Sequence, residues 1–288
     1  MSVCGAHSIC PADPGVCPVS RSAVVVGVAA LVLAALPARA GETVSGRYDI
    51  MIGGLQVGVA GLEGRISDEA YETSISLRLS GVSRLIASGR GTASASGRIS
   101  GGRAIPANYN LTLNTTQQNE AIRMAMTGGA IRSFSAEPER PAAADQVPVT
   151  AAHRQGVLDP LAAGLFFAPG AGPTVTAAAC AKTFPVFDGR QRYDLSFSFA
   201  RTDTIKVAGY EGPVVVCNAR YRAIAGHRPS QTQAMEANRD MQIWLAPIAG
   251  TRALLPARIS IRTPVGVALI EPTKLELGSP STTASISR

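Results

Sequence analysis

Residues 71–80 read YETSISLRLS, and this alternation of apolar and polar side chains decides the predicted fold. Ile75, Leu77 and Leu79 share one face of an extended chain, whereas Ser74 and Arg78 share the other. A period of two residues is typical of a strand with one buried and one solvated face. The same period recurs in residues 109–113, 122–126, 193–199 and 259–262. The sequence therefore predicts a mostly antiparallel sheet.

Short turns that contain glycine separate these segments. They include Gly53-Gly54, Gly101-Gly102, Gly128-Gly129 and Asp188-Gly189. Glycine tolerates the positive φ that tight hairpin turns require, because it has no Cβ. Strands at short, regular intervals are typical of barrels and sandwiches. We therefore predict an all-β fold, either a strongly curved antiparallel sheet or a partly open barrel, with one short helix near the middle of the chain.

That helix is expected within residues 157–167, which read VLDPLAAGLFF. Asp159 can cap it, and Pro160 would occupy the first helical position, where a missing N–H costs little. Leu161, Leu165 and Phe166 would then face inward. Residues 136–150, which precede it, are rich in proline and alanine and predict a loop, since proline cannot donate to a strand ladder.

The first forty residues have the pattern of a secretory signal peptide. Arg21 precedes an apolar run over residues 23–36, and Ala38-Arg39-Ala40 matches a small-residue cleavage site. We predict cleavage before Gly41, a single β-rich domain over residues 41–277 and a disordered tail over 278–288. An uncleaved anchor or a buried helix is the alternative, but the run of about 14 residues is short for a ~30 Å hydrocarbon core. The expected location is periplasmic or secreted, with no membrane span after cleavage.

The chain is basic, with 27 Lys and Arg residues against 20 Asp and Glu residues and a formal net charge of +7. The basic residues are scattered and form no long run, so we expect no nucleic-acid partner. Two cysteines, Cys180 and Cys217, follow the predicted cleavage site. An isolated pair in an exported protein predicts a disulfide, and two buried free thiols are the alternative. Two cysteines without a histidine cluster cannot complete a structural zinc site.

No sequence motif identifies a reaction. The part that follows the predicted signal contains two histidines, His153 and His227, and no G-x-S-x-G elbow, P-loop, H-E-x-x-H or G-x-G-x-x-G element. We therefore predict no catalytic residues, no metal site and no cofactor. An envelope hydrolase stays open as a third alternative, because the members of a Ser-His-Asp triad need not be close in sequence.

Two pairs of arginines form the candidate anion-binding group. These are Arg190 and Arg192, and Arg220 and Arg222. If their strands pair, the four side chains would gather near the disulfide, where arginine forks suit the phosphate or carboxylate of a headgroup or glycan. The alternative is a solvated strand face in which Asp188 or Asp194 pairs with the arginines.

A second candidate is an apolar cavity. The residues expected to line it are Met124, Met126, Phe166, Phe197 and Trp244. A curved sheet closed by a short helix can hold an apolar ligand, but the same side chains would also suit an ordinary packed core. Sequence alone does not separate a filled barrel from a hollow one.

The chain resembles domain-of-unknown-function family 3108, a family of exported bacterial envelope proteins. The resemblance rests on Tyr48, residues 53–58 (GGLQVG), Ile105-Pro106 with Tyr109, residues 158–161 (LDPL), Cys180, residues 186–193 (VFDGRQRY), Cys217 and residues 224–226 (IAG). It implies an exported β-rich protein without an established activity. Members are similar in outline to the LolA/LolB lipoprotein carriers, an analogy between folds that does not fix function.

These observations lead us to expect a non-enzymatic periplasmic protein that binds a lipid-like or envelope ligand or supports envelope integrity. The alternative is an interaction module whose arginine-rich strand face binds an envelope protein or glycan.

Overall fold

The structure is a computed structural model that describes residues 41–80 and 88–278. The predicted signal peptide lies outside these residues, and so does the predicted tail apart from Gly278. Among the described residues, no helix is long and apolar enough to cross a membrane.

Seven strands form the N-terminal half, each paired antiparallel with the next. They are β1 (Glu42–Ile52), β2 (Leu55–Ile66), β3 (Ala70–Leu79), β4 (Gly89–Ser100), β5 (Arg103–Thr115), β6 (Asn119–Thr127) and β7 (Ala130–Glu137). Gly53 and Gly54 turn β1 into β2 with φ values of 57° and 85°, so the hairpin uses the conformation that glycine favours.

The C-terminal half begins with a connecting segment and continues as a second meander. The connecting segment holds two 3₁₀ turns, η1 (Ala152–Arg154) and η2 (Ala162–Gly164), then β8 (Phe166–Phe167) and α1 (Ala177–Cys180). The meander comprises β9 (Lys182–Phe187), β10 (Arg192–Val207), β11 (Tyr210–Ala225), α2 (Pro229–Ala237), β12 (Met241–Pro247), β13 (Ala253–Thr263) and β14 (Gly266–Leu277).

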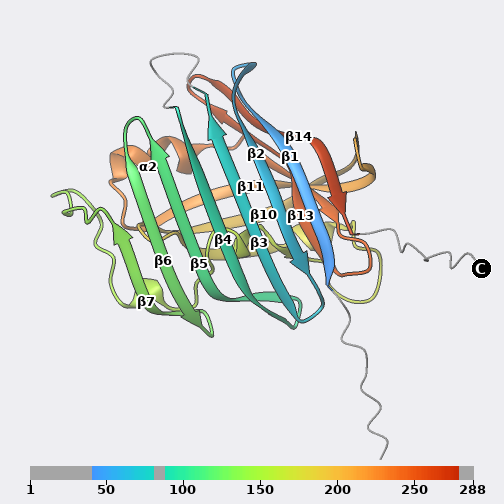
Figure 1. The fold of residues 1–288 in the computed structure, drawn as a ribbon, viewed down its shortest axis with the longest axis horizontal. Helices are drawn as coiled ribbons and strands as arrows, with labels where there is room; N and C mark the ends of the chain where they lie inside the picture. Colours follow the sequence, from blue (N-terminus) through green and yellow to red (C-terminus); the bar gives the residue numbers. More distant parts are fainter. Residues whose placement is uncertain (1–40, 81–87, 279–288) are drawn as a thin grey trace, which may run out of the picture. The chain divides into compact units, whose positions relative to one another are not determined.

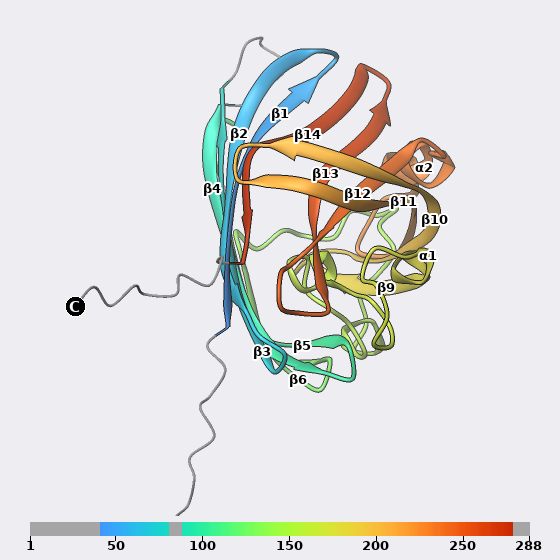
Figure 2. The same cartoon turned by 90° about the vertical axis from the view of Figure 1, so that its right-hand side faces the viewer.

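One antiparallel pairing, between β1 and β14, joins the two halves into a single sheet. The order is β7-β6-β5-β4-β3-β2-β1-β14-β13-β12-β11-β10-β9, with β8 paired to β13, so β7 and β9 are edges and the sheet is not closed. Figures 1 and 2 show the sheet curling until the C-terminal strands lie across one face of the N-terminal strands. The predicted all-β fold, a strongly curved antiparallel sheet, is confirmed.

The alternation in residues 71–80 is present as predicted. Tyr71 and Thr73 are buried, and Ile75 is half-buried on the same face, whereas Ser74 and Arg78 are exposed on the other. The inner face of the N-terminal half packs into the larger of two core clusters, which also contains Phe187 and Trp244.

Residues 157–167 do not form the predicted helix. Only the 3₁₀ turn η2 forms there, and the chain then extends into β8. Asp159 does cap the turn, because its Oδ1 accepts the N–H groups of Leu161 and Ala162, both at 2.9 Å. Phe166 and Phe167 leave the helical path because they pair with Leu254 and Ala253 of β13. The α-helices of the described residues, α1 and α2, lie elsewhere and were not predicted.

Candidate functional site

An apolar pocket of about 380 Å³ lies inside the curled sheet. It is bounded by β1–β3 on one side, by β10 and β12–β14 on the other, and by the segment around η2. Its walls are mainly aliphatic and aromatic and include Ile50, Ile75, Leu77, Leu161, Leu195, Phe197, Ile243, Ile259 and Ile270.

A row of isoleucines across four strands builds one wall. Ile50 of β1 pairs with Ile270 of β14, which pairs with Ile259 of β13, which pairs with Ile243 of β12. Directly paired residues share a face of the sheet, so the four side chains project to the same side. Because this row crosses the junction of the two halves, the pocket depends on the β1–β14 pairing.

The five residues predicted to line one cavity are divided between two core clusters, and of the five Phe197 alone lines the pocket. Phe197 lines the pocket, whereas Phe166 is fully buried in the smaller core cluster, where its ring packs edge-on against Phe184 and Phe197 at 5.1 and 4.9 Å. Met124 and Met126 lie in the larger core cluster, and so does Trp244.

Trp244 is held by polar neighbours. Its indole N–H donates to Asp203 Oδ2 at 2.9 Å, and this bond helps to hold the pKa of that carboxyl below its usual value. The guanidinium groups of Arg201 and Arg258 lie 5.4 and 5.5 Å from the indole ring, within cation–π range. Arg258 also lines the pocket, so Trp244 contacts a lining residue but does not itself line the pocket.

The gap between the edge strands β7 and β9 is closed by the connecting segment and by the β9–β10 turn. Leu158 forms a parallel bridge with Val186 of β9. Phe134 of β7 and Phe187 of β9 stack edge-on at 6.0 Å, and Arg154 lies over both rings at 5.1 and 5.9 Å. We call this contact region, residues 186–190 against β6 and β7, the seam.

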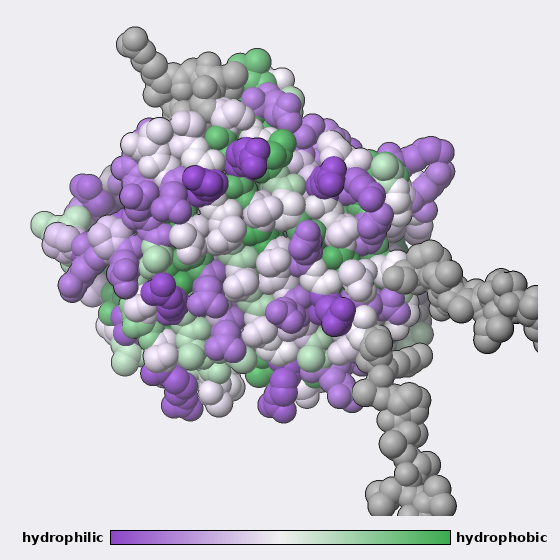
Figure 3. All heavy atoms as spheres, in the orientation of Figure 1, coloured by the Kyte–Doolittle hydropathy of each residue, from purple (hydrophilic) through white to green (hydrophobic). Residues whose placement is uncertain are grey.

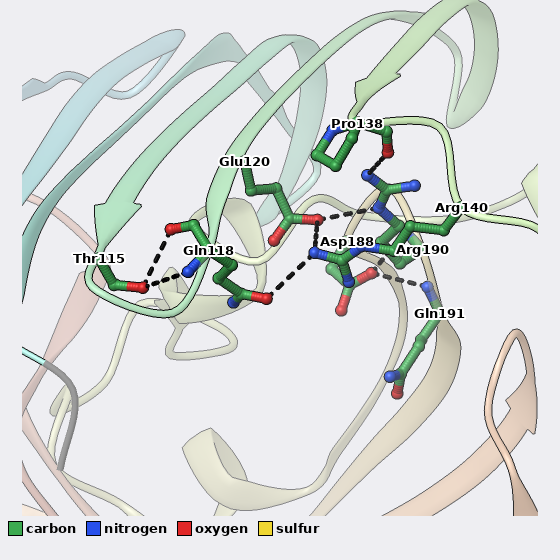
Figure 4. Close-up of polar contacts among 8 residues, drawn as sticks. All are labelled: Thr115, Gln118, Glu120, Pro138, Arg140, Asp188, Arg190 and Gln191. Atoms are coloured by element: carbon green, nitrogen blue, oxygen red, sulfur yellow. Dashed lines mark hydrogen bonds and ion pairs between the residues drawn. The ribbon is translucent and has the colours of Figure 1, made fainter. Parts of the chain in front are cut away.

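A polar network fastens the seam (Figure 4). Arg190 Nε donates to Glu120 Oε1 of β6 at 2.9 Å, and its Nη2 donates to the Pro138 carbonyl at 2.7 Å. Arg140 lies 3.4 Å from the same Glu120 oxygen. Asp188 Oδ1 accepts the N–H groups of Arg190 and Gln191, which fixes the turn. The turn therefore docks on β6 through one shared carboxylate.

Of the four arginines of the predicted anion-binding group, Arg192, Arg220 and Arg222 lie on the β10–β11 hairpin, and Arg190 lies apart from them. Arg190 belongs to the seam, and Arg192 forms an ion pair with Asp194 at 2.7 Å. Arg222 lies opposite Asp194 in the β10–β11 register, while Arg220 donates to the Arg239 carbonyl at 2.9 Å. These contacts match the alternative in which a solvated strand face pairs with nearby acids.

The predicted disulfide is present. Cys180 of α1 and Cys217 of β11 are bonded, with their Cα atoms 5.5 Å apart, and both are fully buried in the smaller core cluster. The bond ties α1 to the long β10–β11 hairpin.

A profile of the family described as "Protein of unknown function (DUF3108)" matches residues 47–271. The chain belongs to the DUF3108 family. No curated protein matches it. The chain is similar to a solved structure, the beta-barrel-like protein of domain of unknown function DUF1849 from Brucella abortus, with 11% identity and a TM-score of 0.48. The similarity covers 83% of this chain and 99% of that chain.

Residues 186–190, which lie within the matched range, form part of the seam. Gly189 has φ +100°, and a Cβ there would lie 2.5 Å from Cγ2 of Ile122 on β6. Glycine is required for both the conformation and the close approach. Sequence identified the Asp-Gly turn but not its partner Glu120, because the two segments are about seventy residues apart and no local pattern relates them.

Asp159 is a buried carboxyl whose two oxygens differ in their contacts. Its Oδ1 caps η2, but among the described residues its Oδ2 has no hydrogen-bond partner, and neither do the buried hydroxyls of Tyr71 and Thr73. Burial raises the pKa of Asp159 to about 6, since desolvation outweighs its backbone hydrogen bonds. Burial also raises the pKa of Tyr71, with a further contribution from the charge of Asp159.

The burial of Asp159 predicts that the free energy of unfolding depends on pH. The folded protein holds the Asp159 proton more tightly than the unfolded chain does, so the free energy of unfolding falls as pH rises from 3.8 to about 6. Asp159→Asn keeps an acceptor oxygen for the cap and cannot ionise. Relative to this variant, the wild type should lose roughly 3 kcal/mol across that window, given about 1.4 kcal/mol per pKa unit. Urea unfolding of both proteins on either side of the window measures the difference, and parallel pH profiles would contradict it.

The two histidines occupy different settings. His153 lies in η1, where its Nδ1 accepts the Thr150 N–H at 3.1 Å, while His227 is buried. Within residues 41–80 and 88–278, no three His, Cys, Asp or Glu side chains are grouped so that they could hold a metal ion.

Proposed function

We propose that this DUF3108 protein is a non-enzymatic protein of the periplasm that binds a lipid-like ligand in the apolar pocket. The observation that carries the proposal is the pocket of about 380 Å³ with its aliphatic and aromatic walls. Its size falls within the ~300–1,000 Å³ of typical small-molecule sites. Apolar cavities hold water poorly and accept apolar guests, so an acyl chain suits these walls.

The polar groups at the pocket favour binding over chemistry. Its ionisable lining residues are Tyr48 and Arg258. Tyr48 donates its hydroxyl to the Pro256 carbonyl at 3.1 Å, and burial raises its pKa further above neutrality. Arg258 forms an ion pair with Glu271. Tyr48 therefore does not exchange a proton near neutral pH, as a general acid or base must.

The sequence and the disulfide support the proposed periplasmic location. The predicted signal peptide implies export, and a buried disulfide is typical of proteins that fold in an oxidising compartment.

A substitution that fills the pocket tests this proposal. Ile75→Trp adds an indole to a half-buried lining position on β3 and should abolish uptake of a fluorescent fatty acid, because it occupies the ligand's volume. An empty pocket should accept the larger side chain with less than the ~1–3 kcal/mol that overpacking a filled core costs. Fluorescence titration measures uptake, and urea unfolding measures stability.

The matched control is Ser74→Trp, which places the same side chain on the solvent face of the same strand. It should leave uptake unchanged. If Ile75→Trp binds the probe as the wild type does, or if the wild type takes up none, the apolar pocket is not a ligand site.

A further inference from the structure

A second hollow, of about 1,020 Å³, lies on the outer face of the N-terminal half, where β1–β5 approach the β1–β2 turn and the β5–β6 turn. Its charged lining residues are Arg47, Asp49, Arg78 and Arg90. The rest of the lining is rich in hydroxyl and amide groups from Ser76, Ser88, Thr92, Thr112, Asn114 and Thr115. Figure 3 views this outer face, where hydrophilic residues are interspersed with residues of intermediate and hydrophobic character.

The register sets two arginines directly against each other. Arg78 of β3 pairs with Arg90 of β4, and both are exposed. Like charges directly opposite on neighbouring strands destabilise a sheet. The next partners along this row are Val59 on one side and Asn114 on the other, so the row supplies no adjacent acid.

Neither arginine is neutralised within the described residues. No salt bridge or side-chain hydrogen bond of Arg78 or Arg90 exists there. Asp49, the acid in the hollow, accepts a hydrogen bond from Gln56 Nε2 at 2.8 Å. Two other arginines of the N-terminal half have acidic neighbours, since Arg65 lies opposite Glu72 and Arg123 lies 3.9 Å from Glu137.

We propose that Arg78 and Arg90 bind a phosphate-type oxyanion on the outer face of the sheet. Two guanidinium forks provide paired donors for its oxygens, and an anion between them removes the repulsion that the register creates. The hydroxyls of Ser76 and Thr92, which are cross-strand partners in the next row, supply further donors. The phosphate is either free or part of a lipid headgroup. The proposal does not depend on the apolar pocket, which lies on the opposite face of β1–β3.

Calorimetric titration with inorganic phosphate tests the free ion, and flotation with vesicles of phosphatidylglycerol and phosphatidylcholine tests the headgroup. The double variant Arg78→Gln/Arg90→Gln should weaken binding about ten- to a hundredfold, as expected when charge-assisted hydrogen bonds are lost. Binding should also weaken with added salt. Arg65→Gln, on the same face, is the matched control and should bind as the wild type does.

Each outcome decides the proposal. Loss of phosphate binding in the double variant supports a free-ion site, and loss of vesicle binding alone supports a headgroup site. The proposal is overturned if the wild type binds neither probe or if the double variant binds as tightly. Both positions are exposed, so the variant should fold. A thermal unfolding curve like that of the wild type is the control. Uptake of the fluorescent fatty acid by the variant should be unchanged, which separates this proposal from the proposed function.

Discussion

Replacing Cys180 and Cys217 with serine should lower the free energy of unfolding by about 4 kcal/mol. The disulfide closes a loop with a sequence separation of 37, and a loop of this length restricts the unfolded chain by that amount. Both sulfur atoms lie in fully buried residues, so the serine hydroxyls add a further cost if they find no partner. Urea unfolding of the variant and the wild type measures the difference.

The wild type under reducing conditions is the control for this prediction, since it loses the bond without gaining hydroxyls. A loss of stability below about 1 kcal/mol in both experiments would show that the bond restrains the unfolded chain far less than its loop length implies. Recovery of two alkylatable thiols from freshly isolated protein would contradict the disulfide itself.

Gly189→Ala should destabilise the protein by roughly 2–5 kcal/mol. An alanine at φ +100° is strained by about 1–3 kcal/mol, and its Cβ would lie 2.5 Å from Ile122 Cγ2, so the Ile122 side chain, β6 or the turn must shift. Movement here separates Arg190 from Glu120 and opens the seam. Thermal or urea unfolding reports the loss of stability, and amide hydrogen exchange in β6 and β9 reports the opening.

Two other glycines separate the causes. Gly170→Ala places alanine at φ +64° with no atom within 4 Å, so it should show the backbone strain alone. Gly172→Ala lies in open space without a positive φ and should be near neutral. If Gly189→Ala costs no more than Gly170→Ala, then contact with Ile122 does not stabilise the seam.

Sequence patterns predicted the features that depend on residues close together in the chain or on residue type. Alternation assigned the buried face of β3, glycine pairs marked the hairpins, and the isolated cysteines indicated the disulfide. The cap at Asp159 was also predicted, because capping needs only a side-chain oxygen two or three residues before the free N–H groups. The length of the turn was not, since pairing of Phe166 with β13 is a long-range contact.

The candidate sites depend on pairings that no local pattern encodes. The pocket wall requires Ile50 to meet Ile270, which is about 220 residues later in the chain, and the outer hollow requires Arg78 to register against Arg90. Phe197 was predicted to line a cavity from its apolar strand face, but the same reasoning included Met124 and Trp244, which share that chemistry and lie in the larger core cluster. Periodicity identifies which face of a strand is buried, but only the fold determines whether that face borders a pocket or a packed core.

Native mass spectrometry of the protein purified from the periplasm, its proposed location, tests the central claim most directly, because it asks whether the pocket is occupied in protein taken from the cell. We expect a mass above that of the processed chain, with an adduct that organic extraction identifies as a lipid-like molecule and that Ile75→Trp lacks. A bare mass for the wild type, together with no uptake of added fatty acid, would contradict ligand binding in the apolar pocket.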